Sequence, residues 1–176
     1  MLAQLYLAYE QKLKSIIDPK TGEPFFKHFD LWNQNVEFIE QETPFETPAV
    51  FFEFVPIQWR TMGQQVQDAD LTIKLHIVTQ WYGQTAEYTP EQIRVQMLEY
   101  LNIPGIVVRA LQGFCTPFTN GLMRTQSTTN HNHERYVDSV EEYVCRVEDS
   151  SAEHKYTMKK LAPDVTAELA IKKALK

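Results

Sequence analysis

The chain has 176 residues, of which 43% are hydrophobic and 12% aromatic, a composition that excludes disordered and fibrous proteins and suffices for one packed domain. The net charge is −6, but it is divided unevenly. Residues 1–153 hold 11 basic against 21 acidic residues (−10), whereas residues 154–176 hold six lysines against two acidic residues (+4). Because an acidic body repels a phosphate backbone, we expect the folded part to bind no sequence-specific nucleic acid.

Location and redox chemistry are also constrained by the sequence. No run approaches the ~20 apolar residues that cross a bilayer, and the start MLAQLYLAYEQKLK lacks the features of a signal peptide, so we expect a cytosolic protein with no membrane contact. Cys115 and Cys145 are too few for a disulfide framework or a zinc site. We expect them to be buried or half-buried free thiols, and no motif implies a cofactor.

The N-terminal region predicts a helix followed by less regular structure. In residues 2–17, apolar residues recur at three- and four-residue steps, which is typical of an amphipathic helix that ends near Asp18-Pro19. Residues 25–42 are rich in aromatics but irregular, and predict one or two short strands. Residues 48–59 (PAVFFEFVPIQW) are apolar on both parities, which predicts a strand covered on both faces until Pro56 interrupts the pairing.

A glutamine-rich stretch, residues 60–70, follows this strand. It is too long for a tight hairpin turn and has no pattern that would form a core, so it predicts a loop that projects and contacts a partner. Its candidate partner-binding residues are Met62, Gln64, Gln65 and Gln67.

The segment DADLTIKLHIVTQWYG, from residue 68, alternates strictly and predicts a half-buried antiparallel strand over 68–80. The residues Leu71, Ile73, Leu75 and Ile77 share one face, and Thr72, Lys74, His76 and Val78 share the other. Lys74 and His76 together raise the question of acid–base chemistry, but no carboxylate stands at a recognisable spacing beside them. We therefore interpret Thr72, Lys74 and His76 as a solvent-side or subunit-facing contact surface.

The second half of the chain predicts a helix and a hairpin. Thr89-Pro90-Glu91-Gln92 combines an N-cap, a proline at the first helical position and a capping-box glutamine, and predicts a helix over 89–102 that ends at Ile103-Pro104-Gly105. A short apolar segment, 106–111, comes next. The runs 119–129 and 135–148 then predict a hairpin. The apolar stripe of the helix is Ile93, Met97, Leu98 and Leu101, and the core positions of the last strand are Tyr143, Cys145 and Val147.

These elements predict an α+β fold in which an antiparallel sheet of about four strands packs against two helices. Residues 1–150 form the single domain, and residues 151–176 form a basic C-terminal extension. The lysines of the extension alternate with apolar residues, so we expect an amphipathic segment that docks on a neighbour in preference to a nucleic-acid arm.

A histidine-rich turn lies between the two strands of the hairpin. His131, His133 and Glu134 could hold a metal ion, with His76 or His28 as a further ligand. The same residues are also suited to an exposed hairpin tip, and no other constellation of nucleophile, base or ligand accompanies them. We therefore expect no metal and no catalysis.

The order of the elements resembles that of the small tail-terminator and tail-completion proteins of long-tailed bacteriophages. The likeness covers residues 1 to about 150 and is one of pattern, without an invariant catalytic signature. It lies in an amphipathic opening helix followed by FKHF, in the strand TPAVFFEF, in DADLTIKLHIVTQWYG with its aromatic-glycine end, and in the closing segment HERYVDSVEEYVCRVED.

The resemblance implies an α+β virion subunit, assembled in the bacterial host cytoplasm, that forms a homo-oligomeric ring, usually of six, on the end of the tail tube. There it would stop tube growth and present a surface to the head–tail connector proteins. The chain departs from the family outline in its longer region 25–46 and in its basic extension after residue 150. A head–tail connector or stopper of the same virion remains an alternative, as does a metal-dependent enzyme that uses His131, His133 and Glu134.

Overall fold

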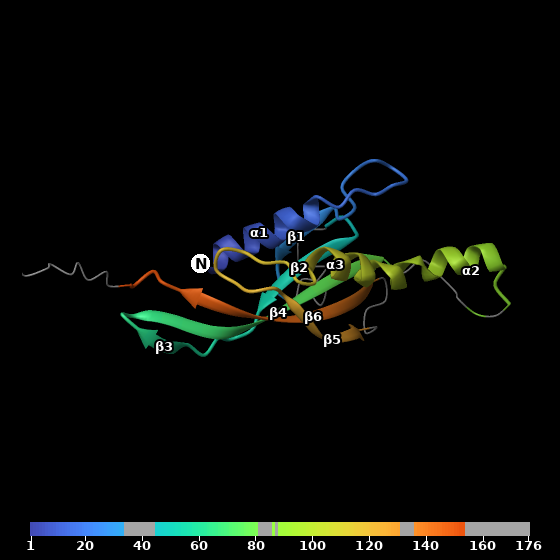
Figure 1. The fold of residues 1–176 in the computed structure, drawn as a ribbon. Coiled ribbons are helices and arrows are strands. Elements are labelled where there is room, and N and C mark those ends of the chain that lie inside the picture. The colour runs from blue at the N-terminus through green and yellow to red at the C-terminus, as the bar shows by residue number, and fades with distance from the viewer. Residues whose placement is uncertain (34–44, 81–85, 87, 131–135, 154–176) are drawn as a thin grey trace, which may run out of the picture.

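The computed structural model describes residues 1–33, 45–80, 86, 88–130 and 136–153. Over these residues the chain is α+β, with an open sheet of six strands in the order β1-β2-β4-β6-β5 and with β3 paired to β4 outside that path (Figure 1). The strands are β1 (His28–Leu31), β2 (Ala49–Phe54), β3 (Arg60–Gly63), β4 (Val66–Gln80), β5 (Met123–Asn130) and β6 (Tyr136–Asp149). The helical elements are α1 (Leu2–Lys14), α2 (Glu91–Leu98), the 3-10 turn η1 (Glu99–Asn102) and α3 (Ile103–Leu111).

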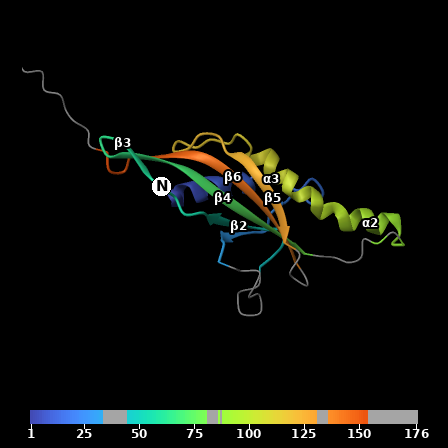
Figure 2. The same cartoon turned by 90° about the horizontal axis from the view of Figure 1, so that it is seen from below.

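One face of the sheet carries the main core, and α1 and α3 cover it (Figures 1 and 2). The apolar stripe of α1 and the last turns of α3 point into this core because their residues recur at helical spacing. The helices bury Leu5, Tyr9, Leu13, Val107 and Leu111. The two long central strands bury Leu71, Ile73, Leu75, Ile77, Tyr143, Cys145 and Val147. The alternation predicted for residues 71–77 and the core positions predicted for residues 143–147 are therefore confirmed.

The two-sided strand predicted over 48–59 is confirmed for Ala49–Phe54, whereas residues 55–59 lie outside the strand. In β2, Val50 and Phe52 join the main core, whereas Ala49 and Phe51 join a second cluster on the opposite face of the sheet. The strand ends at Phe54, two residues before the proline that cannot donate to a ladder.

The predicted sheet was wrong in strand number and in direction. β1 runs parallel to β2, with His28 paired to Ala49, so the sheet is mixed and has six strands instead of about four. A four-residue strand alternates too briefly for its direction to be predicted. Residues 60–63 and 66–70, predicted as a loop, form β3 and the start of β4, joined by the two-residue turn Gln64-Gln65.

The helix prediction was right for its start and wrong for its end. α2 begins just after Pro90, but Ile103-Pro104-Gly105 opens α3 instead of terminating the helical region. A proline is tolerated in the first turn of a helix because its missing N–H has no partner there. The second helix of the core is therefore α3, and α2 extends beyond it.

The described part of the molecule is elongated along its two long strands. The hairpin of β3 and β4 extends from one end of the sheet, and α2 extends from the opposite end (Figures 1 and 2). The last strand, β6, ends at the hairpin end, where Asp149 pairs with Gln67. Two structurally different elements thus project at opposite ends of one open sheet.

Candidate functional site

The predicted contact residues of the 60–70 stretch lie on the projecting hairpin. All four residues of β3 are exposed, and Met62 has 62% of its surface accessible. The turn residues Gln64 and Gln65 both have positive φ angles, 49° and 63°, which is the signature of a type I′ turn. Met62, Gln64 and Gln65 are therefore presented together at the tip, and Gln67 lies nearby at the start of β4.

This turn leads to a stability prediction. We expect the double substitution Gln64→Asn with Gln65→Gly to raise the free energy of unfolding by about 1 kcal/mol, because asparagine and glycine adopt positive φ with less strain than glutamine. Urea denaturation measures the change. Gln67→Asn is the control, since asparagine in the neighbouring strand should not stabilise. A turn variant no more stable than the wild type would contradict the prediction.

A cluster of charged side chains around the buried Asp68 holds the base of the hairpin to the last strand. The Asp68 carboxylate is buried and accepts hydrogen bonds from Arg146 (2.6 Å) and Arg60 (3.1 Å), while Arg60 also contacts Asp70 at 3.3 Å. Burial by itself raises the pKa of Asp68, but the two arginines outweigh it, and the pKa is lowered. The pKa of Asp68 is therefore lower in the folded state than in the unfolded state. At pH values above the unfolded-state pKa, the pairing contributes its full stabilisation of the fold. This stabilisation is lost as the pH falls through the folded-state pKa.

A hollow of about 560 Å³ lies beside this charged cluster. We call it the hairpin-end hollow. Its wall comes from the hairpin, the loop before β5 and the end of β6, and it includes Asp68 and Arg146 of the charged cluster just described. The residues that define it are Met62, Asp68, Pro117, Phe118, Thr119, Asn120, Arg146, Val147, Glu148 and Ser150.

The face with Thr72, Lys74 and His76 is only partly the exposed surface that was predicted. Thr72 and Lys74 are half-buried, and Lys74 lies 3.4 Å from the Glu53 carboxylate. His76 is 7% exposed, so the solvent-side prediction is wrong for this residue. Thr72 and Lys74, which are half-buried, remain predicted contact residues.

His76 is the centre of an internal polar cluster that sequence reasoning missed. Its Nδ1 lies 2.9 Å from Oδ2 of the buried Asp138, and its Nε2 lies 3.4 Å from Glu53. The Trp32 indole stacks on the imidazole with ring centroids 3.6 Å apart and planes at 4°. Both carboxylates come from neighbouring strands, on which Glu53 pairs with Lys74 and Asp138 with Val78. Strand register therefore brings these carboxylates to His76, and no spacing of residues within one segment of the sequence could have predicted them.

A histidine between two carboxylates could in principle act as a base. In the described part of the chain, however, its hydrogen-bonding partners are carboxylates only, with no hydroxyl or thiol in the position of a nucleophile. The stacked indole and the burial of the ring also separate it from substrate. The arrangement fits a polar contact that fixes the segment before Asn33 on the outer face of the sheet.

The candidate metal ligands divide between described and undescribed parts. His131, His133 and Glu134 lie outside the described residues. His28 is half-buried and packs against Phe45 and Phe51 with ring centroids 5.6 Å away. Among the residues that the structure describes, no group of three metal-ligating side chains comes together.

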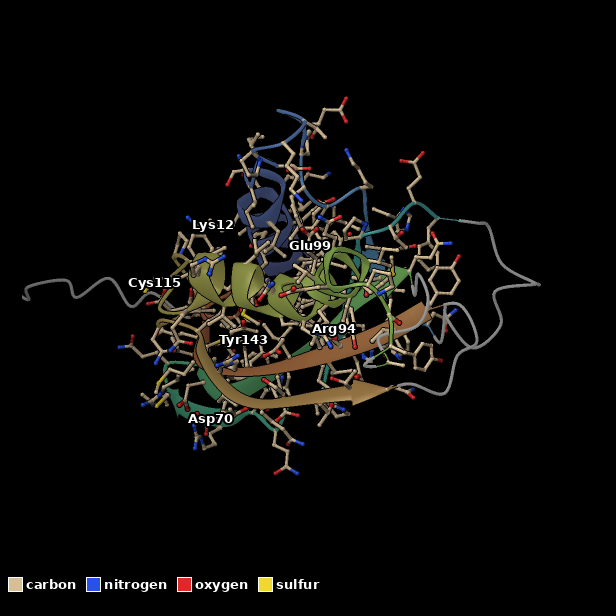
Figure 3. The ribbon with its side chains drawn as sticks, turned by 90° about the vertical axis from the view of Figure 1, so that its right-hand side faces the viewer. Lys12, Asp70, Arg94, Glu99, Cys115 and Tyr143 are labelled. Atoms are coloured by element: carbon tan, nitrogen blue, oxygen red, sulfur yellow. The ribbon has the colours of Figure 1, made fainter. Side chains whose placement is uncertain are left out.

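The helix α2 is a second candidate surface, because its apolar stripe has no core to cover. Ile93 and Leu98 in α2 are 47% and 37% exposed, and Leu101 in η1 is 57% exposed. The main contacts of α2 within the described chain are with η1, and through η1 it continues α3 outward. Figure 3 looks at this end of the molecule, with Arg94 and Glu99 on the α2–η1 segment in front of the sheet. The stripe was predicted correctly as a pattern, but its burial against the sheet was not.

A cavity of about 660 Å³ lies at the root of α2, between η1, α3 and the end of β4. Its wall is largely apolar, with Phe25, Met97 and Ile106 among its residues. The hydroxyl of Thr79, a residue that is 5% exposed, has no hydrogen-bond partner among the described residues and lies in this wall. The cavity lies behind the projecting helix and so belongs to the same end of the molecule.

The two thiols differ from each other. Cys145 is buried in the main core, and burial raises its pKa to about 11, so it stays a protonated thiol at neutral pH. Cys115 is exposed, which corrects the prediction that both thiols would be buried or half-buried. Neither forms a disulfide.

Within the described residues, no helix has the length and apolar character needed to cross a membrane.

No protein-family model matches the chain, and no curated protein matches it either.

Proposed function

We propose that the chain is a structural virion protein that forms a ring of six copies at the end of a phage tail tube, stops tube polymerisation and joins the tail to the head. Its partners would be further copies of itself, the tail tube protein and the head–tail connector proteins. It would act in the virion tail after assembly in the host cytoplasm, without a cofactor, a metal or a catalytic step.

The observation that carries this proposal is the combination of element order and shape. The sequence pattern of residues 1–150 resembles that of the tail-terminator family. The sheet that these residues build has two different projections at its opposite ends. A closed ring requires two different surfaces on each subunit, because each copy contacts one neighbour with one surface and the next neighbour with the other. A polar hairpin and an apolar helix at opposite ends meet this requirement.

Light scattering and negative-stain imaging of the purified chain, alone and with the tail tube protein, test the proposal. We expect rings of six copies that bind the ends of assembled tubes and limit their length. A chain that remains monomeric at every concentration, with and without tubes, would contradict it. Rings that bind the connector proteins but not the tube would favour the connector alternative.

The enzyme alternative is tested on the same preparation. Zinc, manganese or iron that survives dialysis at one ion per chain, and is lost on His131→Ala with His133→Ala, would favour a metal-dependent enzyme. We expect no such retention, because the same residues are equally suited to an exposed hairpin tip and the sequence places no other ligand motif beside them.

A further inference from the structure

Two exposed apolar features of this protein lie at its opposite ends and lack an occupant within the described chain. One is the stripe of α2, and the other is the hairpin-end hollow. The inference below rests on the proposed ring and names the contact that would close it.

The helix α2 needs a partner for physical reasons. It extends beyond the sheet as a continuation of η1 and α3, so its apolar side chains are left in contact with water. Ile93 in α2 and Leu101 in η1 are exposed, and Met97 between them is half-buried and lines the cavity at the root of α2. An apolar stripe on a short projecting helix is typical of a helix that docks into a groove on another protein.

The hairpin-end hollow has the properties that such a helix requires. Its volume of about 560 Å³ can take several side chains, and Met62, Pro117 and Phe118 supply an apolar surface. Arg60 and Arg146, with side chains 57% and 55% exposed, lie beside it. Apolar patches with a polar rim are typical of protein interfaces.

Charge is compatible with the pairing of these two surfaces. The helix carries Glu91 in its first turn and Arg94 one turn later. The residues that define the hollow include the exposed Arg146 and the exposed Glu148. Each charge on the helix therefore has an opposite charge available in the hollow, which favours one register of docking over others.

We propose that α2 of one copy docks into the hairpin-end hollow of the next copy. The occupant is a second copy because the same chain supplies both surfaces and holds them at opposite ends, where they cannot meet within one molecule (Figures 1 and 2). Repeated contacts of this head-to-tail kind close into a ring when the rotation between copies allows it. The other possible occupants, the tube protein and residues 154–176 of the chain, become outcomes of the test.

Two variants test this contact, and each of them disrupts only one of its two surfaces. The helix variant carries Ile93→Ser with Leu101→Ser, and the hollow variant carries Met62→Glu with Pro117→Ser. Leu7→Ser with Met123→Ser is the matched control, because these residues are 57% and 62% exposed but belong to neither surface. All the substituted residues are exposed, and circular dichroism with thermal unfolding checks that each variant folds.

We expect each one-sided variant to raise the concentration at which the oligomer dissociates at least tenfold, whereas the control leaves it unchanged. A mixture of the helix variant and the hollow variant should then form 1:1 dimers in native mass spectrometry, because each mixed pair keeps one intact helix and one intact hollow. A helix variant that still forms wild-type rings would overturn the docking inference and leave the proposed function standing. Absence of the 1:1 dimer would also overturn it, with the tube or residues 154–176 as the remaining occupants.

Failure of the proposed function has a different signature. If the wild-type chain forms no oligomer alone or on tubes, both one-sided variants have nothing to disrupt, and the ring itself is contradicted. If the wild type forms symmetric dimers that the helix variant abolishes and the hollow variant does not, α2 pairs with another α2. That outcome contradicts the docking of α2 into the hairpin-end hollow.

Discussion

The substitution His76→Ala is expected to lower the free energy of unfolding by about 3 kcal/mol. It removes the hydrogen-bond partner of Asp138 Oδ2, whose carboxylate is 2% exposed and whose Oδ1 already has no partner in the described chain. It also removes the ring on which Trp32 stacks at 3.6 Å. A buried carboxylate without its hydrogen bond and an aromatic face without its contact both destabilise the folded state.

Urea denaturation of a double-mutant cycle tests this account. Asp138→Ala alone should also destabilise the fold, but the double variant His76→Ala with Asp138→Ala should lose less than the sum of the two single losses, by about 0.5–3 kcal/mol. Lys74→Ala is the control on the same strand face. Its 3.4 Å contact with Glu53 is partly exposed, and such pairs contribute about 0–1 kcal/mol. Additive losses in the cycle would show that the two residues act independently.

The same data bear on the role of the polar strand face. If the cluster around His76 only fixes the outer layer on the sheet, its variants should change stability in the monomer as much as in the oligomer. A loss confined to the oligomer would instead place His76 at the subunit contact that the sequence predicted. The stability of the isolated subunit therefore distinguishes an internal contact from an interface.

The periodic parts of this sequence were sufficient to predict the central strands and the core positions that they bury. Residues 71–77 alternate so regularly that they predict one apolar face, and β4 buries that face, although His76 and Val78 on the other face are buried as well. The apolar run of β2 predicted cover on both faces, which the two clusters provide. Each of these patterns lies within one segment of the chain, and the burial of its apolar side chains decides which face of the strand turns to the core.

The features that escaped prediction depend on contacts between distant segments. The carboxylates near His76 arrive through pairing with β2 and β6, 23 and 62 residues away, and no spacing within one segment encodes them. The turn Gln64-Gln65 lacks the asparagine and glycine that announce a type I′ turn, so pairing of β3 with β4 sets its conformation. An apolar stripe on a helix likewise shows that the helix has a partner, but not whether this is its own sheet or another molecule.

The basic extension, residues 154–176, lies outside the described part of the chain. It follows a strand that ends at Asp149, which pairs with Gln67 at the hairpin end of the sheet. In the proposed ring, this is the end that meets α2 of the next copy. An extension with charge +4 would therefore start beside a neighbour whose residues 1–153 carry −10.

Truncation after Ser151 is expected to leave the domain folded, because every strand and helix of the described sheet and core lies before it. It should nevertheless weaken the oligomer about tenfold at low salt, since it removes both a charge attraction and an apolar stripe that includes Val165 and Leu169. The difference between full-length and truncated chains should shrink as salt rises, because screening weakens the attraction in the full-length ring as well.

A variant with the six lysines of the extension changed to glutamine separates the two contributions. It should lose the salt-dependent part of the effect and keep the part that comes from apolar contact, so its dissociation concentration should lie between those of the full-length and truncated chains. Light scattering across a dilution series, repeated at low and high salt, measures all three proteins. Equal oligomer masses for the full-length and truncated chains at low salt would show that the extension does not act across the subunit boundary.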